Sequence, residues 1–288
     1  MKDFIISTDS TADLPQSYLK ENNIALHPLY YIVGGKEYGF GISELSPKDF
    51  YESMRNGKMP TTSSSNPEYI TNLMKKQIGR GYDILHISFS SGLSCSYNNA
   101  AVCARNVMEE VPNANILVVD SLCATVGQGL IVHRAVQLKK QGKTMEEIAE
   151  WIKENRQHIV HQFIVDDLFH LVRGGRLSKS TAFFGTALRI QPLLYLDHKG
   201  RISNIGKVRG RKKALNTLAD NIEEKIKGFE LDTVFISHGD CIEDAIYLAD
   251  RIKNKYGIEN IMVNDICPTI GAHTGLGTVV VSYFGNER

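Results

Sequence analysis

The sequence contains no apolar stretch long enough to cross a membrane as a helix. The longest candidate, GTVVVSYFG at 277–285, has about half of the ~18 apolar residues that a spanning helix needs. The N-terminal stretch MKDFIISTDS has only a short apolar run before Asp9, which favours a buried strand over a signal peptide. We therefore predict a cytoplasmic protein that makes at most transient contact with a membrane.

Cysteines are few, and none of them form a CxxC pair. The five lie at positions 95, 103, 123, 241 and 267. An odd and scattered set of thiols is typical of a reduced, cytoplasmic protein, and it argues against both a disulfide framework and a zinc site. We expect no metal and no cofactor.

The chain also lacks an excess of charge, since its formal net charge is +1. This balance argues against a bulk binder of nucleic acid, which would need a local basic patch. The segment KVRGRKK (207–213) has five positive charges in seven residues, but no aromatic residues interleave with them. A solvated surface, an acidic protein partner, a carboxylate or phosphorylated head group and a nucleic acid remain open for it. A nucleic-acid-binding regulator that uses 207–213 stays an alternative, although we do not expect a nucleic acid among the partners.

Strand and helix patterns alternate in the first half of the chain. Apolar, β-rich runs predict strands at 4–8, 24–33, 83–88 and 115–121. Amphipathic segments predict helices at 46–56, 67–79, 96–110 and 126–141. Because 288 residues exceed the ~150 of a typical domain, we expect two domains. The first, residues 1–160, is predicted as an α/β/α domain with a parallel sheet covered on both faces.

The pattern changes near residue 160, after a helix predicted at 144–160. A hairpin is expected at 193–208, with its turn near His198-Lys199-Gly200. Further helices are predicted at 211–227 and 241–255, and further strands at 232–239, 259–265 and 278–284. Residues 161–288 are therefore predicted to form an α+β domain with a mixed or antiparallel sheet.

Hydroxyl-rich stretches fall where strands of the first half are expected to end. They are STDSTADLP (7–15), PTTSSSNP (60–67), SSGLSCSY (90–97) and VVDSLCATVGQG (118–129), and none contains lysine or arginine. In open α/β sheets, ligands bind outside the carboxyl ends of the strands, near helix N-termini. Capping or turn formation is the favoured interpretation of the first and last stretches. The other two have more hydroxyls than a cap needs.

Ser94 has two interpretations, as a nucleophile or as a hydroxyl that donates to an anion. The stretch Gly92-Leu93-Ser94-Cys95-Ser96 lacks the second glycine of a hydrolase elbow. Asp265 and His273 lie downstream in the order that an α/β-hydrolase triad would need, so a serine hydrolase stays open as the alternative. His273 lies among small residues in CPTIGAHTGLG (267–277), which is typical of an exposed loop tip.

Taken in order along nearly the whole chain, these motifs resemble the DegV family. The matching stretches are DSTADLP, PTTS (60–63), SSGLS with Tyr97, VVDS, GQG, RGGRLS (173–178), KVRGRKKAL (207–215) and IGAHTGLG (270–277). Each stretch is weak alone, whereas their order and spacing together are specific. The resemblance implies a two-domain DegV-like fold that is not an enzyme. It also implies one long-chain fatty acid, similar to palmitate or oleate, in an apolar tunnel.

The resemblance also implies roles for individual residues. The implied carboxylate ligands are Thr62, Ser94 and His273. The implied residues of the supporting loops are Ser63, Gly92, Ser10 and Ser121. The residues implied to face the head group or a partner are Arg173, Arg176 and Arg209. That partner would be a bacterial fatty acid kinase, which makes acyl phosphate for phospholipid synthesis. Cys95 stands where the family usually has glycine, and a positive φ there would strain it.

Overall fold

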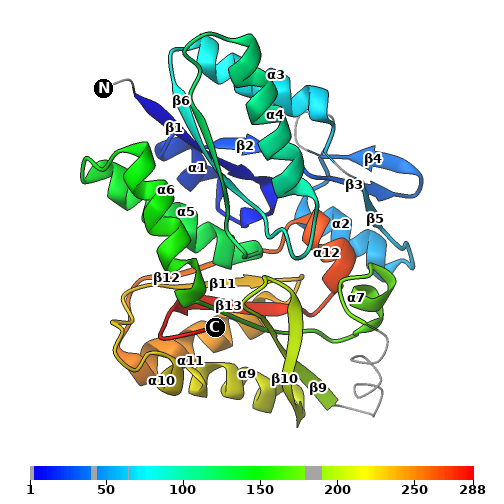
Figure 1. The fold of residues 1–288 in the computed structure, drawn as a ribbon. Helices are drawn as coiled ribbons and strands as arrows, with labels where there is room; N and C mark the ends of the chain where they lie inside the picture. The colour runs from blue at the N-terminus through cyan, green and yellow to red at the C-terminus, as the bar shows by residue number, and fades with distance from the viewer. Residues whose placement is uncertain (1–2, 40–43, 64, 179–189) are drawn as a thin grey trace.

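The computed structural model describes residues 3–39, 44–63, 65–178 and 190–288, which form three sheets and the helices around them (Figure 1). The first sheet has the order β2-β1-β6-β7, and all of its pairs are parallel. Its strands are β1 (Phe4–Asp9), β2 (Ala25–His27), β6 (Asp83–Ser88) and β7 (Ile116–Asp120). The predicted parallel α/β architecture of the first half is confirmed.

Helices cover both faces of this sheet, because alternate side chains of a strand point to opposite faces. Ile5 packs in a cluster with residues of α3 (Pro67–Gly79) and α4 (Ser96–Glu110). Its neighbours Phe4 and Ile6 belong to the cluster that includes residues of α5 (Thr125–Lys140) and α6 (Met145–Asn155). Figure 1 shows the two helix pairs on the two sides of the sheet.

The second sheet has the order β10-β9-β8-β13-β11-β12 and is mixed, since only β11 and β12 pair in parallel. Its strands are β8 (Ile159–Ile164), β9 (Ile190–Leu196), β10 (Ile202–Arg209), β11 (Val234–His238), β12 (Ile261–Asp265) and β13 (Val279–Phe284). Its outer face packs against α9 (Arg211–Asp220), α10 (Ile222–Lys225) and α11 (Ile242–Tyr256). The predicted mixed sheet and the hairpin turn are confirmed.

A third, antiparallel sheet has the order β4-β3-β5. It consists of β3 (Tyr30–Val33), β4 (Lys36–Tyr38) and β5 (Thr61–Ser63), and it packs beside α2 (Pro47–Arg55) and α12 (Pro268–Thr274). The prediction of one strand over 24–33 was therefore wrong. Pro28 separates β2 from β3, and a proline cannot donate the ladder hydrogen bond that a continuous strand needs there.

Two other expectations differ from the structure. The helix predicted at 144–160 ends at Asn155, so Ile159 and Val160 already belong to β8. His273 lies in the last turn of α12 rather than in a loop tip. The remaining short elements are η1 (Ser10–Ala12), α1 (Gln16–Glu21), η2 (Arg156–His158) and α7 (Phe169–Arg173). No helix within the described ranges is long and apolar enough to span a membrane.

Candidate functional site

A cavity of about 200 Å³ lies between the two large sheets. This volume is more than ten times the ~15 Å³ that one water needs, so the cavity can hold a ligand. Most of its wall is apolar and comes from both halves of the chain, for example from Phe89 and Leu93 on one side and from Phe163 and Val280 on the other. The predicted carboxylate ligands Thr62, Ser94 and His273 all line this cavity.

Thr62 and His273 are in direct contact. The Thr62 Oγ1 atom lies 2.9 Å from His273 Nε2, which joins β5 to the last turn of α12. Burial, with the positive charges of Arg176 and Arg173, lowers the pKa of His273 to about 4. The imidazole is therefore neutral near pH 7. Its Nδ1 is buried and has no partner among the described residues.

Ser94 lies in the loop between β6 and α4. Its Oγ is 2.7 Å from Ser96 Oγ and accepts a hydrogen bond from the Ser96 backbone N–H at 3.2 Å. The first backbone amides of α4 have no partner inside the helix, and such amides favour an anion. Cys95 has φ −78 and an exposed side chain. The strain that a positive φ would impose on this cysteine is therefore absent.

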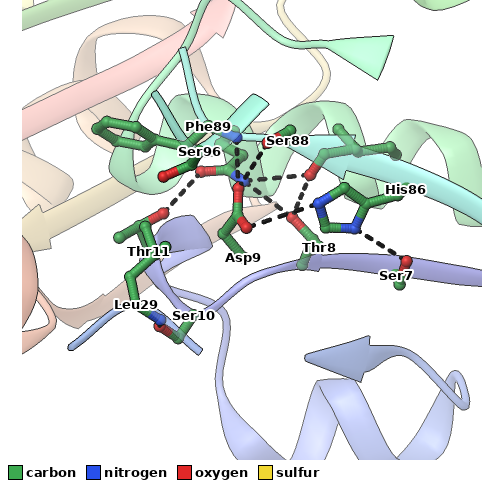
Figure 2. Close-up of polar contacts among 12 residues, drawn as sticks. Ser7, Thr8, Asp9, Ser10, Thr11, Leu29, His86, Ser88, Phe89 and Ser96 are labelled. Atoms are coloured by element: carbon green, nitrogen blue, oxygen red, sulfur yellow. Dashed lines mark hydrogen bonds and ion pairs between the residues drawn. The ribbon is translucent and has the colours of Figure 1, made fainter. Parts of the chain in front are cut away.

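Asp9 positions the start of this loop (Figure 2). Its Oδ2 accepts hydrogen bonds from Ser88 Oγ at 3.0 Å and from the Phe89 N–H at 2.6 Å. Burial opposes ionisation of Asp9, but His86 and the Phe89 amide outweigh it and lower the pKa of the carboxyl. The ionised Asp9 makes no side-chain cap bond to η1. This residue of STDSTADLP thus binds the neighbouring strand end instead of capping a helix.

The residues predicted for the supporting loops have different positions. Ser63 lines the cavity, whereas Ser10 and Ser121 each accept a backbone N–H outside its wall. Gly92 permits a close approach to the β9–β10 turn, because an added Cβ would lie 2.3 Å from the Lys199 carbonyl oxygen. The Gly92 contact holds the Ser94 loop against this turn, whereas Ser10 binds the N–H of Leu29 and Ser121 that of Cys123.

Two of the three predicted arginines lie beside the polar part of the cavity. Arg173 donates to the carbonyl of Pro60 at 2.8 Å and to that of Ala272 at 3.0 Å, next to the segments that hold Thr62 and His273. Arg176 lines the cavity and donates to the Leu93 carbonyl at 3.1 Å. Arg209 is exposed on β10 and does not line the cavity.

The structure does not bring Ser94, His273 and Asp265 together as the triad that the serine hydrolase alternative requires. His273 binds Thr62, while Ser94 Oγ contacts Ser96. Asp265 lies beside a different histidine, with its Oδ1 3.7 Å from His238 Nε2. A neutral histidine with a lowered pKa is also a poor general base. The geometry therefore favours anion binding over nucleophilic catalysis.

The basic cluster at 207–213 is partly neutralised by contacts within the protein. Arg211 forms ion pairs with Asp166 at 3.0 Å and with Asp244 at 2.8 Å. The Lys212 Nζ lies 5.4 Å from the centre of the Tyr247 ring. These charges help to hold α9 against its neighbours, so fewer of them are left for a polyanion.

Six polar residues of the cavity wall were not predicted as site residues: Thr11, Ser96, Thr125, His161, Thr269 and Thr274. Thr125 is the first residue of α5, and His161 lies in β8. The signal for His161 is the alternation in VHQFIV (160–165), which places residues 161, 163 and 165 on one face of a strand. It was missed because the helix predicted at 144–160 covered the start of this strand, and no strand was predicted over 161–165.

Comparison with known proteins gives consistent matches over the whole chain. A family model described as "Uncharacterised protein, DegV family" matches residues 3–286. A DegV domain-containing protein of Clostridium perfringens is 42% identical, with 100% of this chain and 99% of the relative covered. Another, from Lactococcus lactis, is 36% identical over 96% of each chain.

Solved structures of similar fold include DegV, a fatty acid binding protein from Bacillus subtilis. It has a TM-score of 0.87 and 29% identity, with 99% of this chain and 100% of that chain covered. A DegV family protein from Thermus thermophilus, described by its fatty acid binding, has a TM-score of 0.85 and 27% identity, with the same coverage.

Proposed function

The chain belongs to the DegV family, and from this premise we propose that it binds one long-chain fatty acid in the cavity between its two large sheets. The apolar wall suits an acyl chain, which contributes roughly 0.8 kcal/mol per buried methylene before the costs of binding. The relatives from Bacillus subtilis and Thermus thermophilus are described as binding fatty acids. We also propose that the boundary between the two domains lies near residue 160, as the sequence predicts.

The observation that supports the head-group site is the Thr62–His273 contact of 2.9 Å in the same cavity wall as Ser94. A carboxylate inside a protein is costly unless it receives hydrogen bonds. The Ser94 hydroxyl can donate to it. Thr62 and the neutral imidazole of His273 supply one further donor between them, because the hydrogen bond that joins them uses one of their two protons. Arg176 adds a positive charge in the cavity wall.

The proposed role is that of a carrier without catalytic activity, which presents the bound carboxylate to a fatty acid kinase. The exposed Arg209 fits a surface contact with such a partner better than a ligand contact, because it does not line the cavity. Arg173 and Arg176 bind backbone carbonyls beside the head group, so their part is to hold its ligands in place.

Titration of delipidated protein with palmitate and oleate tests the head-group assignment. Replacing Ser94 by Ala leaves a carboxylate oxygen short of a donor, which costs about 1–3 kcal/mol, or roughly 5- to 150-fold in affinity. Ser203→Ala is the matched control, because Ser203 lies outside the cavity wall. Unchanged affinity in Ser94→Ala would show that the carboxylate binds elsewhere.

A further inference from the structure

The cavity wall contains further polar side chains that the proposed carboxylate site does not use. The hydroxyls of Thr11, Ser96, Thr269 and Thr274 have hydrogen-bond partners within the protein, which leaves His161 and Thr125. His161 and Thr125 both line the cavity, and each is only 3% exposed. In a tunnel for a plain hydrocarbon chain, polar groups at these positions would be unfavourable, because buried polar groups need hydrogen-bond partners.

These groups are well separated from the head group along the sheet. The head-group end of the sheet is where β8 leads to α7 with Arg173 and where β13 follows α12 with His273. His161 lies three residues before Ile164, the last residue of β8, and is paired with Ser282 of β13. Three residues of a strand span about 10 Å. His161 therefore faces the middle or the far part of a bound acyl chain.

His161 is held as a neutral ring with one nitrogen engaged. Its Nδ1 lies 2.9 Å from Ser282 Oγ, which leaves Nε2 for a ligand. Burial lowers the pKa of His161 to about 3, so the imidazole is uncharged and can donate or accept a single hydrogen bond at Nε2. Gly127 of α5 makes room for the ring, because an added Cβ would lie 2.5 Å from its Nδ1.

Thr125 has an unsatisfied hydroxyl on a strained backbone. Its Oγ1 is buried and has no hydrogen-bond partner among the described residues. Its φ is 46, which is rare for a β-branched residue. Backbone strain of this kind persists mainly at binding and catalytic sites. Thr125 lines the same cavity as His161 and lies two residues before Gly127, which packs on the His161 ring.

We propose that the cavity selects long-chain fatty acids with a hydroxyl group on the chain, and that His161 and Thr125 are the residues that bind this hydroxyl. The inference rests on the fatty-acid-binding function proposed above. An alcohol group is both a donor and an acceptor, so it can satisfy a neutral imidazole and a threonine hydroxyl at once. A saturated or unsaturated hydrocarbon chain satisfies neither.

A competition assay with delipidated protein tests this selectivity. The ligands are stearate and its 3-, 10- and 12-hydroxy derivatives, each displacing a fluorescent fatty acid. At least one of the two mid-chain isomers is expected to bind about tenfold tighter than stearate, as one well-made buried hydrogen bond allows. The 3-hydroxy isomer, with its hydroxyl beside the carboxylate, is expected to gain nothing.

The outcomes separate this inference from the fatty-acid-binding function. If stearate binds and neither mid-chain isomer binds more tightly, the inference is overturned while the function stands. If stearate and all of its derivatives fail to bind, the function is overturned and the inference with it.

Variants link the preference to the two residues. In Thr125→Val and His161→Leu, the ratio of the stearate and hydroxystearate dissociation constants is expected to fall to about one. His161→Gln, which keeps a hydrogen-bonding group, is expected to restore part of the preference. Phe163→Leu is the matched control, because this apolar wall residue should change both affinities by the same factor. If His161→Leu does not fold, the near-isosteric Thr125→Val decides, and a preference that survives in it overturns the assignment of Thr125.

Discussion

Thr62 Oγ1 and His273 Nε2 lie 2.9 Å apart although 211 positions separate them in the sequence. One residue belongs to the small antiparallel sheet and the other to the short helix before the last strand. The proposed head-group site therefore forms only when segments from both halves of the chain come together. Arg173 reinforces this contact, because it binds carbonyls on both sides.

Gly174→Ala is predicted to weaken fatty acid binding by moving His273. An added Cβ at this position would lie 2.1 Å from His273 Nδ1, so the ring must leave the position in which its Nε2 contacts Thr62. Loss of one hydrogen bond to the carboxylate corresponds to about tenfold in affinity, measured by fatty acid titration. Gly79→Ala, at the last residue of α3, is the control, because nothing lies within 4 Å of its added Cβ. The prediction fails if both variants bind equally well.

Arg209→Glu is predicted to leave fatty acid affinity nearly unchanged but to slow acyl phosphate formation by a fatty acid kinase. Charges at the rim of an interface act mainly on the rate of encounter. Added salt screens such charges, so it should reduce the difference in the rate of acyl phosphate formation between wild type and variant. Lys20→Glu, at an exposed position of α1, is the control for a change of net charge. Loss of lipid binding in Arg209→Glu, with normal binding in Ser94→Ala, would place the head group near Arg209 instead.

Asp13→Asn is predicted to stabilise the protein more at pH 8 than at pH 5. Burial raises the pKa of Asp13 from 3.8 to about 7, so the folded protein holds a proton that the unfolded chain releases. The stability from this group is present at low pH and is lost as pH rises through 7. Relative to wild type, the variant should gain roughly 2–3 kcal/mol between pH 5 and pH 8.

The measurement for Asp13→Asn is urea denaturation at both pH values. Asn tolerates the left-handed backbone found here, φ 48, and keeps an oxygen that can accept the Cys267 N–H, now bound at 3.0 Å. An equal difference between variant and wild type at pH 5 and pH 8 would show that Asp13 is ionised in the folded protein at both values.

The sequence predicts elements well where local signals agree. The helix at 67–79 matches α3 at both ends, because Asn66 caps it and Pro67 is its first residue. The run at 24–33 was predicted as one strand because it is mostly apolar, but Pro28 interrupts it and its two strands join different sheets. That division depends on pairing of β3 with β5, about thirty residues later, which no local pattern reveals.

The site was likewise predictable only where local sequence signals identify its residues. Hydroxyl-rich strand ends and the family resemblance identified Thr62 and Ser94, which the structure places in one cavity wall. The choice of Asp265 as a third member of a triad was wrong, because order along the chain does not show that His238 is its neighbour. His161 was missed because no strand was predicted at 159–164, where the helix predicted at 144–160 covered the first two residues.

The most direct test of the central claim is the identity and amount of lipid that the purified protein contains. Denaturing extraction followed by mass spectrometry should find one long-chain acyl group per protein chain, and delipidated protein should take up added palmitate or oleate in the same ratio. A preparation that contains no lipid and takes up neither fatty acid would contradict the account.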